Sequence, residues 1–285
     1  MKLVYPEQDV GLGTAYERLA IYRLFDRWLE GRHVQTAVDG PVDGMAGIAG
    51  VHLLGLARHG TRVRVELTEQ APLERVRGVY AHLGLADRLE TAVQSADEPG
   101  RTSADLVLTY NALHLLDDWR GYLDRVAQRA RRYLMVSVTS PYSYGVMIRK
   151  AMRVAERGAA DELFDHPSTR PAEIEPALKR YGRIVEHDYL DCPWWPDLFV
   201  ETGQSLWSGT LRRLPLVGRL GGGGETRPAT EAGFLYGPLS FPLFSDHPQH
   251  HELADAMRRH PVFDDRGQRL ARLFGHHHAY LVERA

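Results

Sequence analysis

The chain has 285 residues, which is enough for one large α/β domain or two small ones. Its 35 basic and 37 acidic residues leave a formal net charge of −2, which excludes a general electrostatic attraction for nucleic acid. The single cysteine, Cys192, excludes an internal disulfide and any multi-cysteine metal or iron–sulfur site.

The first ten residues, "MKLVYPEQDV", lack the apolar stretch of a signal peptide. Nowhere do about 18 apolar residues follow one another without interruption, as a membrane-spanning helix would require. We therefore expect a cytoplasmic protein with no integral membrane segment.

Strands and helices alternate along the first half of the chain. Thr14 and Glu17 have the spacing of a capping box that opens a first helix. "HVQTAVD" at 33–39 predicts a short buried strand, and the glycine-rich turn "GPVDGMAGIAG" at 40–50 follows it. Further helices are expected at 50–60, 71–85 and 117–132, and further strands at 62–67, 88–94, 104–110 and 133–139. This order predicts a parallel sheet covered on both faces, which binds ligands beyond the carboxyl ends of its strands.

The second half departs from this alternation. A helix is expected from Pro171 to near Gly182, followed by a strand, and strand character returns only at 276–284. Between them, residues 193–265 are rich in glycine, proline and aromatic residues. We divide the chain into an N-terminal helical segment (1–32), a cofactor-binding core (33–192), an aromatic-rich insertion (193–265) and a final helix and strand of the core (266–285).

Residues 103–138 read "SADLVLTYNALHLLDDWRGYLDRVAQRARRYLMVSV". This resembles class I S-adenosylmethionine-dependent methyltransferases between their fourth and fifth strands: an acid-led strand, a short "LH" stretch, an acidic pair and an amphipathic helix. With the preceding elements the resemblance covers roughly residues 33–139, and "IVEHDY" and "HHHAYLVER" look like the last two strands of that fold. It implies a Rossmann-like, seven-stranded, mostly parallel sheet with helices on both faces, an antiparallel last strand and a late insertion.

The resemblance implies S-adenosyl-L-methionine as cofactor, held at the glycine turn. The family's first motif is an acid followed by G-x-G-x-G; here Asp39 precedes "GPVDGMAG", and Ala46 and Ile48 stand where glycines are expected. The acid that would bind the ribose falls near Leu67, which Glu66 and Glu69 flank. The cofactor-binding residues implied are Asp39, Gly40, Gly44, Gly47, Gly50, Glu66, Asp97 (near the adenine), Asn111 and Tyr16 (closing over the cofactor).

Methyl transfer needs alignment, exclusion of water and sometimes a base. Tyr110, Asn111 and His114 follow the fourth strand, and His114 is the predicted general base, because an unperturbed histidine pKa of about 6.5 suits proton removal near neutrality. Tyr110 and Tyr142 are the other predicted catalytic residues, and Tyr142 would also line the acceptor pocket. A structural alternative stays open: His114 could be a partly buried turn residue and Tyr16 a core residue.

Several histidines raise the question of a metal ion. His247, His250 and His251 lie close in sequence, and 276–278 are three consecutive histidines, but no H-E-x-x-H or comparable motif is present. Consecutive strand residues point to opposite faces, so 276–278 cannot all serve one ion. The sequence predicts no metal.

The aromatics of 193–265 predict an apolar or aromatic small-molecule acceptor if they cover the open end of the sheet. They could instead form the insertion's own core, or the interface of a homodimer. We predict S-adenosylmethionine-dependent methyl transfer to such an acceptor. The alternative is a repurposed methyltransferase-like fold that binds a ligand or partner without methyl transfer. A nicotinamide-dependent oxidoreductase is less favoured, since G-x-G-x-x-G is absent.

Overall fold

A computed structural model describes residues 11–44, 48–95, 97, 100–156, 166–192 and 268–284. Gly47, the aromatic-rich insertion predicted at 193–265 and the histidines at 247–251 lie outside these residues. Within the described part of the chain, no helix is long and apolar enough to cross a membrane.

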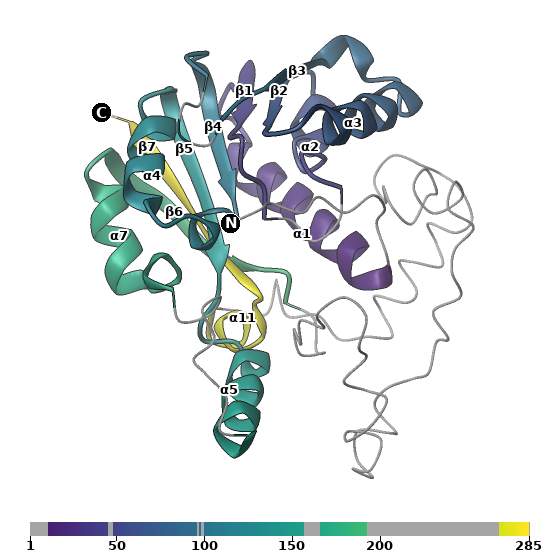
Figure 1. The fold of residues 1–285 in the computed structure, drawn as a ribbon. Coiled ribbons are helices and arrows are strands. Elements are labelled where there is room, and N and C mark those ends of the chain that lie inside the picture. The colour runs from purple at the N-terminus through teal and green to yellow at the C-terminus, as the bar shows by residue number, and fades with distance from the viewer. Residues whose placement is uncertain are drawn as a thin grey trace.

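Helices or helical turns separate the first five strands, except that β4 follows β3 without a helix between them (Figure 1). The strands are β1 (Thr36–Asp39), β2 (Arg62–Leu67), β3 (Leu89–Val93), β4 (Ala104–Tyr110), β5 (Ala130–Thr139), β6 (Gly182–Leu190) and β7 (His277–Arg284). The α-helices are α1 (Gly11–Leu29), α2 (Leu54–Ala57), α3 (Gln70–His82), α4 (Trp119–Ala127), α5 (Tyr144–Glu156), α7 (Pro171–Lys179) and α11 (Gln268–Phe274). Short 3₁₀ turns lie at Ala86–Arg88 (η1), Leu113–Leu115 (η2) and Pro167–Thr169 (η3).

The strands form one sheet in the order β3-β2-β1-β4-β5-β7-β6. β1 to β5 are parallel, and β7 runs antiparallel to both β5 and β6. This confirms the predicted Rossmann-like fold with an antiparallel last strand. The order reverses between β1 and β4: the chain leaves β1 toward β2 on one side and leaves β4 toward β5 on the other. The carboxyl ends of β1 and β4 therefore form the switch point at which such sheets bind ligands.

Helices cover both faces of this sheet, as Figure 1 shows. Strand side chains alternate between two buried clusters: Ala37 and Leu106 pack with α1, α2 and α3, whereas Val38 and Val107 pack with α4 and α7. The apolar runs of the central strands are explained by this double burial.

Three local predictions are wrong, and one helix was missed. The helix expected at 50–60 is the single turn α2, flanked by Gly50 and Gly60, both with left-handed φ angles. The helix expected at 117–132 ends at Ala127, because the residues from Ala130 onward pair with β4 as part of β5. α1 already includes Thr14, so no capping box begins there. Helix α5 was not predicted, although it follows β5 directly.

Candidate functional site

The loop after β1 lies against the end of β4. Asp39 is the last residue of β1, and the Gly40 amide donates a hydrogen bond to the Leu108 carbonyl oxygen (3.0 Å). The Gly44 amide donates to the Tyr110 carbonyl oxygen (3.1 Å), and Asn111 Nδ2 donates to the Gly44 carbonyl oxygen (3.2 Å). A Cβ atom at Gly44 would lie 1.9 Å from the Asn111 carbonyl oxygen, so this position needs glycine. The turn is thus fixed to both strands of the switch point.

Two more glycines of the turn serve packing. Gly50 has a φ of +76°, and a Cβ atom there would lie 2.4 Å from Val65 Cγ1 in the core. At Gly40 a Cβ atom would lie 2.4 Å from the Tyr122 hydroxyl oxygen. Close contact between the turn and β2 therefore requires glycine at position 50, and the approach of a cofactor to its backbone stays a prediction.

A buried ionic cluster links residues within and directly after this turn. His52 Nε2 lies 2.8 Å from Asp39 Oδ2, and His52 Nδ1 lies 3.7 Å from Asp43 Oδ2. Asp43 Oδ2 also accepts a hydrogen bond from the Gly50 amide (2.6 Å). Burial opposes a charged imidazole, but the two carboxylates outweigh it and raise the pKa of His52 to about 9. Burial raises the pKa of Asp39 to about 6, against the pull of His52. Near neutral pH the His52–Asp39 pair is ionised.

Tyr110, at the end of β4, connects this cluster to a second one. Its ring stacks on His52 (centroids 5.2 Å apart) and is tilted against His277 (5.5 Å), and its hydroxyl donates to Glu17 Oε1 (2.8 Å). Burial and the nearby carboxylates raise the pKa of Tyr110 well above its usual value. Tyr110 is therefore a buried hydrogen-bond donor, and the predicted catalytic role has no support in this geometry.

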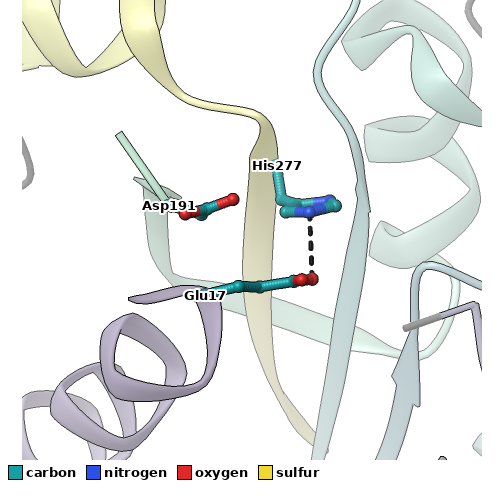
Figure 2. A group of neighbouring side chains, drawn as sticks. All are labelled: Glu17, Asp191 and His277. Atoms are coloured by element: carbon teal, nitrogen blue, oxygen red, sulfur yellow. Dashed lines mark ion pairs between the residues drawn. The ribbon is translucent and has the colours of Figure 1, made fainter. Parts of the chain in front are cut away.

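The second cluster joins Glu17, Asp191 and His277, which come from α1, from the residue after β6 and from the start of β7 (Figure 2). His277 Nε2 lies 3.2 Å from Glu17 Oε1, and His276 Nδ1 lies 2.9 Å from Asp191 Oδ2. All four side chains are buried. The antiparallel direction of β7 brings its first residues to the carboxyl edge of the parallel strands.

The Glu66 carboxylate is engaged within the fold. Arg129 donates two parallel hydrogen bonds to it (2.8 Å each), and Arg64 Nε donates a third (2.8 Å). Glu66 is fully buried, a position that disfavours the predicted contact with a ribose. Glu69 lies exposed directly after β2, and Asp97 lies exposed after β3. These two carboxylates face solvent near the carboxyl ends of their strands.

The predicted catalytic residues are scattered. His114 lies on η2, and burial lowers its pKa to about 3, which disfavours the predicted role as general base. Tyr142 lies after β5, with the Arg272 guanidinium 4.3 Å from its ring centroid. Tyr16 is fully buried, which supports the core alternative. Asn111 has a φ of 48° and accepts a hydrogen bond from the Thr139 hydroxyl (2.6 Å) at its amide oxygen.

A cavity of about 680 Å³ lies at the opposite edge of the sheet. Gln35, which precedes β1, and Thr61, which precedes β2, are among its lining residues, together with Phe25, Leu29 and Leu56. Sheets of this type bind ligands at the carboxyl edge. We therefore look for function at the switch point.

The sequence contains features that indicate the two ionic clusters, although the sequence analysis does not predict either of them. Asp39, Asp43 and His52 interrupt apolar surroundings, and a charged residue in a buried turn needs a partner. Glu17 was interpreted as a capping residue, although it lies on the apolar face of α1. The partners are up to 260 positions apart in sequence, so their pairing follows only from the topology.

No protein-family model matches the chain, and no curated protein does. Among solved structures, magnesium protoporphyrin IX methyltransferase from Synechocystis PCC 6803 with bound SAH is similar with a TM-score of 0.48 and 15% identity, over 67% of this chain and 83% of that one. A segment titled StiE O-MT residues 961-1257 is similar with a TM-score of 0.45 and 11% identity, over 93% of this chain and 72% of that one. Mitomycin 7-O-methyltransferase MmcR is similar with a TM-score of 0.42 and 21% identity, over 62% of this chain and 49% of that one.

Proposed function

We propose that the protein transfers a methyl group from S-adenosylmethionine to a small acceptor. The observation that carries this proposal is the switch point: β1 ends in an acid, Asp39, and a glycine turn follows it at the place where the strand order reverses. The order β3-β2-β1-β4-β5-β7-β6 with an antiparallel β7 is that of the class I methyltransferase fold.

The nucleoside half of the cofactor fits the exposed carboxylates. Glu69 follows β2, and Asp97 follows the edge strand β3, so both carboxylates lie after strands on the β2 side of the switch point. A carboxylate accepts hydrogen bonds from ribose hydroxyls and from an adenine amino group. We assign the predicted binding of the ribose hydroxyls to Glu69 in place of Glu66, because Arg129 already binds the Glu66 carboxylate.

The methionine half meets an altered turn. Asp39 is paired with His52, so a cofactor amine or carboxylate would meet an ion pair in place of a free acid. The cofactor supplies the electrophilic methyl group, and the chain's own residues supply position and exclusion of water. Burial holds His114 neutral, so its imidazole can accept a hydrogen bond from the substrate that receives the methyl group. It is nevertheless a weak base at neutral pH.

The acceptor is proposed to be apolar or aromatic. This rests on the sequence of 193–265, which includes the aromatic residues Trp194, Trp195, Trp207, Phe234, Tyr236, Phe241 and Phe244. A pocket lined by aromatic side chains favours acceptors with a large apolar surface.

A second candidate is a binding protein that keeps the fold without methyl transfer. Its specific support is the engagement of two acids within the fold, Asp39 by His52 and Glu66 by Arg129. The turn would then be a structural element, and the ligand would be held elsewhere on the chain.

Calorimetric titration of variants with S-adenosylhomocysteine tests the proposed site. Glu69→Gln and Asp97→Asn should each weaken binding by about tenfold, since each removes an ionised hydrogen-bond acceptor. Asp87→Asn is the matched control, because it removes an exposed carboxylate from η1, directly before β3 and thus at the opposite edge of the sheet. Equal affinities in all three variants would remove these carboxylates from the site.

A further inference from the structure

Glu17, Asp191 and His277 bring three metal-binding side chains from distant parts of the sequence to one point (Figure 2). One ligand atom from each lies within 4.8 Å of the other two, and all three side chains are buried. In Figure 2 Glu17 faces His277 along the marked ion pair, and the Asp191 carboxylate points toward the same imidazole.

We propose that this cluster binds one first-row divalent cation of the Zn²⁺ type, with Glu17, Asp191 and His277 as its protein ligands. The proposal does not depend on methyl transfer. It adds a metal site to a chain whose sequence predicts none.

The spacing of the donor atoms suits such an ion. Ligands about 2.1 Å from a tetrahedral ion are about 3.4 Å apart, and Glu17 Oε1 and His277 Nε2 are 3.2 Å apart. A ligand atom of Asp191 lies within 4.8 Å of both, so this carboxylate has to move closer for all three to bind one ion.

Neighbouring residues hold the two carboxylates in place. The Tyr110 hydroxyl donates to Glu17 Oε1 (2.8 Å), and His276 Nδ1 lies 2.9 Å from Asp191 Oδ2. Carboxylates that bind metals are commonly oriented by such outer hydrogen bonds. Both Glu17 and Asp191 have such an outer partner, Tyr110 and His276 respectively.

The donor set selects the class of ion. One imidazole with two carboxylates suits Zn²⁺ and its first-row neighbours, whereas Mg²⁺ and Ca²⁺ prefer oxygen ligands alone. Two ionised carboxylates and a neutral imidazole balance the charge of one divalent cation. Three protein ligands leave a fourth position for water or for an oxygen of a bound molecule, as in catalytic rather than structural zinc sites.

The related group Asp39, Asp43 and His52 carries no such proposal. His52 faces Asp39 with Nε2 (2.8 Å) and Asp43 with Nδ1 (3.7 Å), so the two carboxylates lie at different nitrogen atoms of the ring. Asp43 also accepts a hydrogen bond from the Gly50 amide, which fixes it to the turn.

The test uses the full-length protein, freed of metal with a chelator and titrated with Zn²⁺ in a calorimeter. We expect one ion per chain, bound at micromolar concentration or tighter. Glu17→Gln and Asp191→Asn should each weaken binding by about 100-fold. The controls Asp188→Asn and His187→Gln alter β6 beside the cluster and should bind as the wild type does. Circular dichroism verifies that each variant is folded.

Two outcomes would overturn the proposal. The first is wild-type protein that binds no Zn²⁺, or that prefers Mg²⁺. The second is full affinity in the double variant Glu17→Gln/Asp191→Asn, which would place the ion elsewhere. A spectrum of the Co²⁺-loaded wild type needs no variant: nitrogen and oxygen ligands are expected, and an intense near-ultraviolet thiolate band would assign the ion to Cys192 and contradict the cluster.

Discussion

Replacing His52 by glutamine removes the cation that lies between Asp39 and Asp43. In the folded protein these carboxylates hold the pKa of His52 at about 9, against 6.5 for an unperturbed histidine. A histidine whose pKa is higher in the folded than in the unfolded protein stabilises the fold fully at a pH below its unfolded-state pKa. This stabilisation is lost as the pH rises through its folded-state pKa. The difference corresponds to about 3 kcal/mol of unfolding free energy, present at pH 6.5 and lost by about pH 10.

The measurement is urea unfolding of wild type and His52→Gln at several pH values across this range. Between pH 6.5 and about pH 10, the unfolding free energy of the wild type should fall by about 3 kcal/mol more than that of the variant. At pH 6.5 the variant should itself be about 3–5 kcal/mol less stable, because two buried carboxylates lose their counter-charge. The charged groups facing His52 are Asp39, Asp43 and Glu17. Because His52 also lowers the pKa of Asp39, the comparison is repeated in the Asp39→Asn background, where this carboxyl group no longer titrates.

The matched control is His59→Gln, which removes an exposed histidine paired with Asp26. It should keep the wild-type dependence on pH. Parallel pH curves for wild type and His52→Gln would refute the reasoning, since they would mean that His52 is not protonated in the folded state.

Three further substitutions test the packing of the site. Gly50→Ala should cost about 2–4 kcal/mol of unfolding free energy, because it combines a left-handed φ with a Cβ atom 2.4 Å from Val65 Cγ1; Gly50→Ala with Val65→Ala should recover part of this in urea unfolding, and no recovery would exclude the contact. Arg129→Met should cost about 3–5 kcal/mol by leaving Glu66 buried without its bidentate partner, and adding Glu66→Gln should restore much of it. Gly44→Ala should push the turn away from the Asn111 carbonyl oxygen and raise the amide hydrogen exchange of residue 44, whose bond to Tyr110 would break; unchanged exchange would contradict the close approach.

The sheet could be predicted from sequence because its strands carry strong local signals. The strands 62–67 and 104–110 were predicted with the bounds that the structure gives them, since polar or glycine residues end each apolar run. Helix α2 could not be predicted as one turn. The apolar spacing of 50–60 suits a helix, but the contacts of Gly50 with Val65 and of His52 with Asp39 fix the first residues in another conformation.

The candidate site was only partly readable. Asp39 and the glycine turn were located correctly at the end of β1, because that end follows from the strand pattern. The register of β2 decides whether Glu66 or Glu69 faces the carboxyl edge, and a shift of one residue turns a strand side chain to the other face. The pairing of Glu66 with Arg129 and of Glu17 with His277 joins residues 63 and 260 positions apart, which no local pattern reports.

The most direct test of the central claim is calorimetric titration of the wild-type protein with S-adenosylmethionine and S-adenosylhomocysteine, with NADH as control. The account predicts one site per chain that binds both sulfur nucleosides at micromolar concentration, and no binding of NADH. Binding of neither sulfur nucleoside would contradict a cofactor site at the β1–β4 switch point and favour the binding-protein alternative.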